Sequence, residues 1–182
     1  MLRYLYLRWF SQPAADRLLY KLLKKRLFRS IVEVGIGQGI RTQRMFDVAL
    51  RPAHDQSPLR YTGIDLFEAR GNDDRGLSLK AAYSLLKRPG VQLQLVPGDP
   101  LAALSRMANS LRETDLLIIS HDQSGDSLAA AWFWVPRMLH SDSLVYLERP
   151  GKQPGQTTFQ LVSALEIARW ASQTERHRRR AA

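Results

Sequence analysis

The feature that most constrains the fold is a short apolar stretch that runs directly into three closely spaced glycines. Residues 31–34 read Ile-Val-Glu-Val, and glycines follow at positions 35, 37 and 39 before a helical pattern begins. Glycine adopts positive backbone angles at little cost and lets a ligand or a neighbouring helix approach the backbone closely. A strand, a glycine-rich turn and a helix in this order are typical of cofactor-binding loops in parallel α/β sheets.

Strand and helix patterns alternate along the rest of the chain. This alternation predicts an α/β fold with three layers, in which helices cover both faces of a doubly wound, mostly parallel sheet of about five strands. The predicted strands are residues 31–34, 60–65, 91–96, 115–120 and 143–148. The predicted helices are residues 16–28, 40–50, 77–87, 101–111, 127–140 and 157–172. No antiparallel strand is expected after the last predicted strand.

The net charge of +10 is concentrated in two segments of the chain. Residues 1–30 carry +7, residues 31–174 are neutral, and residues 175–182 carry +3. The sequence therefore predicts a basic helical extension, a central domain and a basic tail. Basic segments can bind nucleic acid or an anionic membrane surface, and they can equally be solvated helix faces. Both interpretations remain open at this stage.

Composition excludes several classes of site. The chain has no cysteine, so it forms no disulfide and no thiolate metal site. No apolar run approaches the roughly 20 residues that a membrane-spanning helix needs. The first residues are apolar but are interrupted by Arg3 and Arg8, which is unlike a signal peptide. A cytoplasmic location is expected, with peripheral membrane attachment as an alternative.

Glu33 stands two residues before the first glycine and completes the pattern [D/E]-x-G-x-G-x-G. This pattern resembles motif I of the class I S-adenosylmethionine-dependent methyltransferases, and the resemblance extends over about residues 31–150. It implies the strand order 3-2-1-4-5 and S-adenosylmethionine as cofactor. It also implies that the acid lies near the methionine part of that cofactor. The chain looks like a minimal version of the family, without the hairpin of strands 6 and 7.

The resemblance also assigns two further acids to the cofactor. Asp65 ends the second predicted strand, where the family has an acid that accepts hydrogen bonds from the ribose diol. Asp99, in Gly-Asp-Pro, matches an acid near the adenine amino group, although Pro100 departs from the family pattern. Either carboxylate could instead cap a turn or a helix. The predicted cofactor-binding residues are Glu33, Gly35, Ile36, Gly37, Gly39, Asp65, Leu66 and Asp99.

The fourth predicted strand ends in Ser120-His121-Asp122. It resembles a branch of the family in which this strand ends in an acid followed by Gly-Asx-His, but the order is altered here. His121 is the candidate general base because the ordinary pKa of histidine is near 6.5. Asp122 is the candidate residue that orients it. No metal site is predicted, since Asp126 is the only other carboxylate nearby in the sequence. A polar strand end that caps the next helix remains an alternative.

Two functions from different classes remain open. The first is methyl transfer from S-adenosylmethionine to an unidentified substrate, for example to an oxygen of a small molecule. The second is a non-catalytic binding module that docks an acidic partner, nucleic acid or a membrane through its basic ends. The oligomeric state is not predicted.

Overall fold

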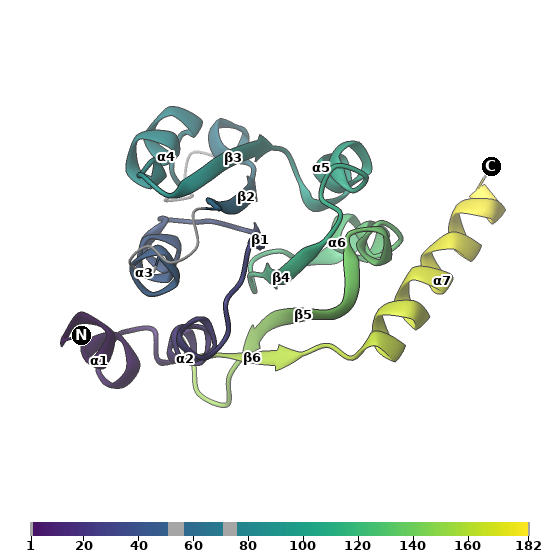
Figure 1. The fold of residues 1–182 in the computed structure, drawn as a ribbon. Helices are drawn as coiled ribbons and strands as arrows, with labels where there is room; N and C mark the ends of the chain where they lie inside the picture. Colours follow the sequence, from purple (N-terminus) through teal and green to yellow (C-terminus); the bar gives the residue numbers. More distant parts are fainter. Residues whose placement is uncertain (1, 51–56, 71–75, 182) are drawn as a thin grey trace.

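A six-stranded sheet forms the centre of the computed structural model, which describes residues 2–50, 57–70 and 76–181, with side chains up to residue 176 (Figure 1). The strand order is β3-β2-β1-β4-β5-β6, with the first five strands parallel and β6 antiparallel to β5. The strands are β1 (Ser30–Val34), β2 (Leu59–Asp65), β3 (Val91–Pro97), β4 (Thr114–Ile119), β5 (Leu139–Pro150) and β6 (Thr157–Leu161). The predicted α/β fold with a mostly parallel sheet is confirmed.

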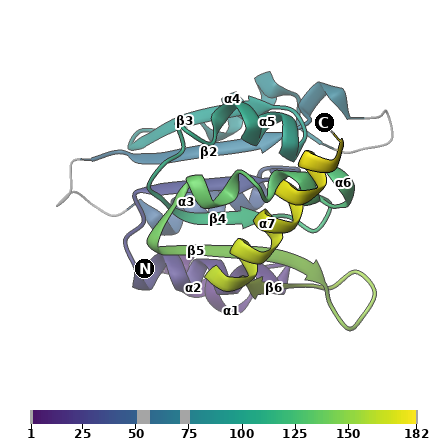
Figure 2. The ribbon, with the colours of Figure 1, turned by 90° about the vertical axis from the view of Figure 1, so that its right-hand side faces the viewer.

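Helices cover both faces of this sheet, as Figures 1 and 2 show. One face carries α1 (Leu2–Trp9), α2 (Arg17–Lys25), α3 (Ile40–Ala49) and α4 (Leu79–Leu86). The other carries α5 (Pro100–Met107), α6 (Gly125–Ala131) and α7 (Ala164–Ala181). Each face has its own apolar core, because β1 and β4 are buried on both sides.

The prediction that the sheet stops after five strands was wrong. Residues 157–172 were expected to form one helix, but Thr157–Leu161 is strand β6 and α7 begins at Ala164. The apolar residues of this segment, Phe159 and Leu161, alternate with Thr158 and Gln160, and of these Phe159 is buried in the core. The apolar spacing that suggested a helix includes Leu165, which is 81% exposed and therefore marks no core-facing stripe.

The elements before β5 also differ from the prediction. The helix expected over residues 127–140 ends at Ala131, and a short 3-10 turn, Val135–Arg137, follows it. Pro136 has no backbone N–H to continue an α-helix. Strand β5 then begins at Leu139, earlier than the expected residue 143.

The basic segment of residues 1–30 shares a core with the rest of the protein. Leu7, Leu19 and Tyr20 are buried in the cluster that also contains Phe46 of α3. A 3-10 turn, Ala14–Asp16, precedes α2, and α1 was not anticipated as a helix. Within the described ranges, no helix has the length and apolar character needed to cross a membrane.

Candidate functional site

The turn between β1 and α3 places three glycines in left-handed conformations. The φ angles are +87° at Gly35, +58° at Gly37 and +71° at Gly39. A Cβ atom on Gly35 would lie 2.8 Å from the Cβ of Ser120, and one on Gly39 would lie 2.9 Å from Leu85. A Cβ on Gly37 would meet no atom within 4 Å. Two glycines therefore allow close packing, whereas Gly37 leaves its backbone open to a ligand.

Asp65, at the end of β2, holds this turn in place. One carboxylate oxygen accepts hydrogen bonds from the backbone N–H groups of Ile36, at 2.8 Å, and Gly37, at 2.9 Å. The other accepts from the N–H of Leu66, at 2.6 Å, and from Nε of Arg70, at 2.9 Å, with which it also forms an ion pair. A carboxylate has about four acceptor positions, so these donors occupy all of them.

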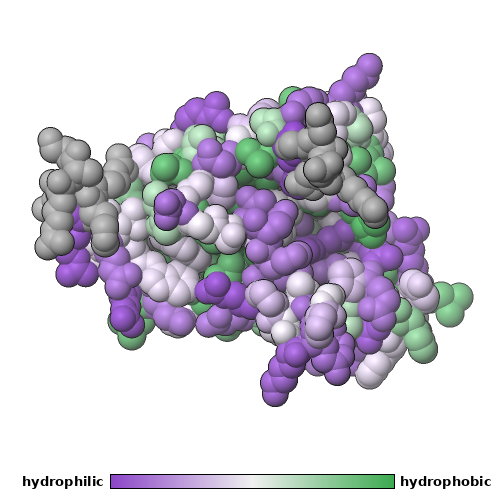
Figure 3. Space-filling model, turned by 180° about the vertical axis from the view of Figure 1, so that it is seen from behind, coloured by the Kyte–Doolittle hydropathy of each residue, from purple (hydrophilic) through white to green (hydrophobic). Residues whose placement is uncertain are grey.

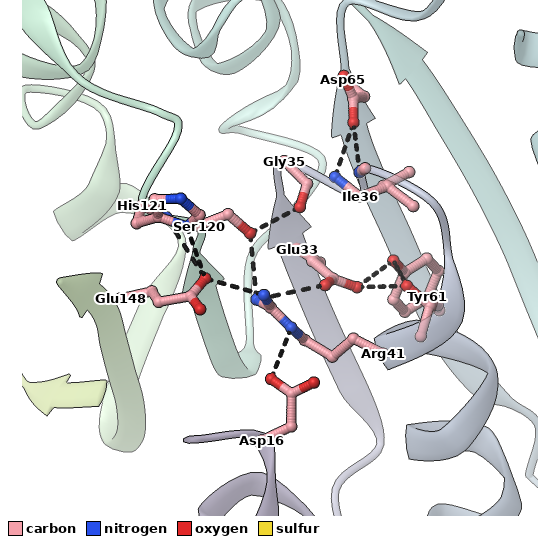
Figure 4. A network of polar contacts seen from close by, with 12 residues as sticks. Asp16, Glu33, Gly35, Ile36, Arg41, Tyr61, Asp65, Ser120, His121 and Glu148 are labelled. Atoms are coloured by element: carbon pink, nitrogen blue, oxygen red, sulfur yellow. Dashed lines mark hydrogen bonds and ion pairs between the residues drawn. The ribbon is translucent and has the colours of Figure 1, made fainter. Parts of the chain in front are cut away.

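Arg41, in the first turn of α3, lies at the centre of a network that joins three strands and the turn before α2 (Figure 4). Its Nη2 donates to Oε2 of Glu148 at 2.8 Å, and its Nη1 donates to Oγ of Ser120 at 3.1 Å. Its Nε lies 3.0 Å from Oδ1 of Asp16, and its Nη1 lies 3.9 Å from Oε1 of Glu33. One guanidinium thus faces three carboxyl groups.

Glu33 is completely buried beneath the turn. Its Oε2 accepts hydrogen bonds from the hydroxyls of Tyr61, at 2.6 Å, and Thr42, at 2.7 Å. Burial raises the pKa of Glu33, because the interior disfavours its charged form, while Arg41 acts in the opposite direction. Glu33 therefore binds Thr42 and Tyr61 in the interior next to the turn. Its predicted contact with a cofactor stays a prediction.

The other two acids around Arg41 behave differently from each other. Burial raises the pKa of Asp16, although the charge of Arg41 opposes it. Burial acts to raise the pKa of Glu148, but the charge of Arg41 and the hydrogen bonds from Thr157 and Arg41 together hold that pKa below the ordinary value. Glu148 is therefore the acid of this network that remains ionised most readily.

The side chain of His121 lies beside Glu148, and the orienting role predicted for Asp122 stays a prediction. Its Nδ1 is 3.6 Å from Oε2 of Glu148, and its backbone N–H donates to the same oxygen at 3.4 Å. The His121 side chain is 51% exposed. Asp122 instead lies 3.9 Å from Arg70. Glu148 ends the last predicted strand and directly follows the last residue of β5 that pairs with β4. This position could have identified it, since neighbouring parallel strands end at the same edge of a sheet.

Asp99 caps the N-terminus of α5. Its Oδ1 accepts hydrogen bonds from the N–H of Ala102, at 3.0 Å, and from the hydroxyl of Ser127, at 2.5 Å. The bond from Ser127 is the main reason that the pKa of Asp99 is lowered. The capping alternative is therefore observed, and the predicted adenine contact stays a prediction.

Two hollows meet at His121. The smaller, about 250 Å³, surrounds the glycine turn and is lined by Gly35–Gly39, Arg41, Ser120–Asp122 and residues of the turn before α2. The larger, about 990 Å³, lies between the ends of β4 and β5 and helices α6 and α7. His121 lines both of them. Across the described part of the chain, no group of three or more His, Asp or Glu residues is placed to hold a metal ion.

Comparison with known proteins gives structural matches alone. No family model and no curated protein matches the chain. A TehB-like S-adenosylmethionine-dependent methyltransferase from Corynebacterium glutamicum superposes with a TM-score of 0.51 at 16% identity, covering 88% of this chain and 71% of that one. A methyltransferase from Agrobacterium tumefaciens gives 0.50 at 10% identity, covering 87% of this chain.

The glycopeptide N-methyltransferase MtfA, solved with sinefungin, gives a TM-score of 0.50 at 16% identity and covers 85% of this chain and 67% of that one. The chain spans about half, 48%, of the Agrobacterium protein. These likenesses concern the arrangement of strands and helices. The chain has the fold of the class I S-adenosylmethionine-dependent methyltransferases.

Proposed function

We propose that this protein is a methyltransferase that holds S-adenosylmethionine at the glycine turn and a small-molecule substrate in the larger hollow. The observation that carries this proposal is the position of His121, which lines both hollows. A methyl donor and a methyl acceptor must meet at one point, and a general base is useful only at that point.

The residues of the turn fit the cofactor in two respects. The open space at Gly37 suits a ligand that approaches the backbone, and Asp65 stands at the strand end nearest the turn. When bound, S-adenosylmethionine supplies a methyl group activated by an adjacent sulfonium. Gly35, Ile36, Gly37 and Gly39 would then border the cofactor, with Asp65 as the acceptor for its ribose hydroxyls.

Arg70 opposes this binding in the structure as it stands. Both oxygens of Asp65 are occupied, and the smaller hollow is below the roughly 300–1,000 Å³ that ligand pockets usually offer. The side chain of Arg70 is only 6% exposed, so it covers the carboxylate closely. Cofactor binding would require Arg70 to leave one oxygen of Asp65.

His121 and Glu148 form the proposed base. Glu148 keeps a negative charge because Arg41 lowers its pKa, and it faces Nδ1 of His121. A carboxylate there favours the tautomer with the proton on Nδ1, which leaves Nε2 as an acceptor. Nε2 would then accept the proton that a substrate hydroxyl or amine loses as its oxygen or nitrogen bonds to the methyl carbon. The bond from that carbon to the sulfonium would break at the same time, leaving its electron pair on sulfur.

The larger hollow suits a small molecule with an apolar body. Its walls include Leu128, Trp132, Leu147 and Trp170, and polar groups such as Arg149 lie beside them. A volume of about 990 Å³ falls within the range of small-molecule sites. These features support a small molecule as the substrate, and methylation of one of its oxygens is the more specific proposal.

The occupied carboxylate of Asp65 favours one alternative, a non-catalytic binding module whose cofactor site is closed. In that case the Asp65–Arg70 pair would be a permanent part of the fold. The affinity of the folded protein for S-adenosylmethionine distinguishes these two functions.

Isothermal titration with S-adenosylmethionine tests the proposal. We expect micromolar binding by the wild type and at least about tenfold weaker binding by Gly37→Val, because the new side chain fills the open space. Gly155→Val is the matched control, since Gly155 also has a positive φ and open space but lies in the β5–β6 loop. It should bind like the wild type. Absence of binding by folded wild type would refute the methyltransferase and leave the binding module.

A further inference from the structure

Helix α1 carries apolar side chains on two opposite sides. On the inner side Leu7 is 2% exposed and packs into the core with the half-buried Tyr4. The outer side is spaced i, i+3, i+4 and i+7, which forms one continuous stripe on a helix. Its members are Leu2 (85% exposed), Leu5 (42%), Tyr6 (56%) and Trp9 (58%), and Phe10 (70%) directly follows the helix. We name these five residues the outer stripe.

Basic side chains flank the outer stripe. At about 100° per residue, Arg3 and Arg8 project from α1 on either side of it. The guanidinium of Arg8 lies 4.9 Å from the ring of Trp9, at the edge of the stripe. Helix α2 packs against α1 and presents exposed Lys21 and Lys25. Figure 3 shows apolar side chains protruding beside polar ones at the right-hand edge, where α1 lies in that view.

We propose that the outer stripe and the lysines of α2 dock this protein onto an anionic lipid surface. A helix that lies in a membrane interface buries aromatic and aliphatic side chains among the lipids and keeps basic residues at the headgroups. α1 has this arrangement. Leu7 and Tyr4 on its inner side pack it against the domain, so that the outer stripe stays exposed. The proposal does not depend on methyl transfer.

Charge and chemistry favour a lipid surface over other occupants. Residues 1–30 carry +7, which opposes face-to-face contact with a second copy of the chain. Nucleic acid would attract the basic residues, but Leu2 and Leu5 offer it no complementary contact. An anionic bilayer satisfies both parts of the surface, because its acyl region accepts the stripe and its headgroups pair with the cations.

Co-sedimentation with phosphatidylcholine vesicles, with and without phosphatidylglycerol, tests the proposal. We expect the wild type to partition at least about tenfold more strongly onto the phosphatidylglycerol vesicles, and salt should weaken this. The Leu5→Ser/Trp9→Ser variant should lose at least about tenfold in partitioning. Both side chains are exposed, so the variant should keep the wild-type circular dichroism spectrum. Leu165→Ser, which changes an exposed leucine on α7, should partition like the wild type.

Charge reversal tests the second half of the surface. Lys21→Glu/Lys25→Glu should weaken partitioning onto anionic vesicles about tenfold or more. Lys80→Glu/Lys152→Glu makes the same change in net charge at exposed positions elsewhere and should have a much smaller effect. The proposal is overturned if folded wild type does not partition, or if both lysine pairs act alike. It is also overturned if light scattering shows that the outer stripe holds two copies of the chain together as a dimer, or if the protein binds RNA through the outer stripe.

Discussion

The two hollows that meet at His121 differ in how they are closed. The one at the glycine turn is small, and its lining includes Arg41, which pairs with Asp16 and Glu148. The one under α6 and α7 is larger and has tryptophan and leucine in its walls. The first must open before it admits a cofactor-sized ligand, whereas the second already offers the volume of a small-molecule site.

This difference shows two ways of building a site on one sheet. Ion pairs at the glycine turn set its shape through a few directional contacts, so single substitutions there should have large and specific effects. The larger hollow depends on the packing of separate helices, and its shape is spread over many weak contacts.

The largest effect is expected from Arg41→Met. Removing the guanidinium leaves Asp16, Glu33 and Glu148 without their shared cation, and breaking a buried ion pair typically costs about 3–5 kcal/mol. Urea denaturation should show this loss in the free energy of unfolding. A loss below about 1 kcal/mol would mean that Arg41 does not hold the smaller hollow together.

The glycine turn offers a matched pair of substitutions. Gly35→Ala should destabilise the protein by about 2–4 kcal/mol, because its Cβ would overlap Ser120 and its φ is left-handed. Gly37→Ala has the same backbone strain but open space, so about 1 kcal/mol is expected. Thermal or urea unfolding of both variants checks the order. Equal losses would contradict the distinct roles assigned to these two glycines.

His121→Gln tests whether His121, which lines both hollows, is the general base. Turnover should fall about 100-fold, a typical contribution of a general base, while affinity for S-adenosylmethionine stays unchanged. His140→Gln is the control, because His140 pairs with Asp115 at the opposite end of the sheet from the site. Once a substrate is found, a variant that retains full turnover would exclude His121 as the base.

A smaller effect of opposite sign is expected from Arg70→Ala. This change frees one oxygen of Asp65, so affinity for S-adenosylmethionine should rise several-fold, because binding no longer has to displace the arginine. Titration calorimetry measures it against the wild type. Weaker binding would instead make Arg70 part of the binding surface and would contradict its role in blocking Asp65.

The smallest effect concerns the pH dependence of stability. The pKa of Glu33 is raised above its ordinary value of 4.5 by burial, so its stabilising contribution is complete below that value and is lost as pH rises through the folded-state pKa. Compared with Glu33→Gln, the wild type should therefore be relatively less stable at about pH 8 than at about pH 5. Urea denaturation at both values checks the sign.

The sequence was sufficient to predict those elements whose formation depends on residues close together in the chain. Strand β1, the glycine turn and α3 follow one another in the chain, so their pattern was sufficient to locate them. The β6 strand was missed because its register depends on the edge of β5, which no local pattern reveals. Glu148 was missed as a site residue for a similar reason. It lies far from His121 in sequence, and only the parallel pairing of β4 and β5 brings the two together.

Ion pairing was the least predictable part of the site. Asp65 was recognised as an acid at a strand end, but its pairing with Arg70 depends on how the 3-10 turn Phe67–Ala69 places the residue that follows it. In the same way, the sequence could not predict the ion pairs of Arg41, because its three acidic partners come from different parts of the chain.

A crystal structure of the protein with S-adenosylhomocysteine would show directly whether the glycine turn is the cofactor site. We expect the ligand to lie over Gly37, its ribose hydroxyls to contact Asp65, and Arg70 to have moved off that carboxylate. A structure from crystals grown with saturating ligand that shows Arg70 still paired with Asp65 and no ligand at the turn would contradict it.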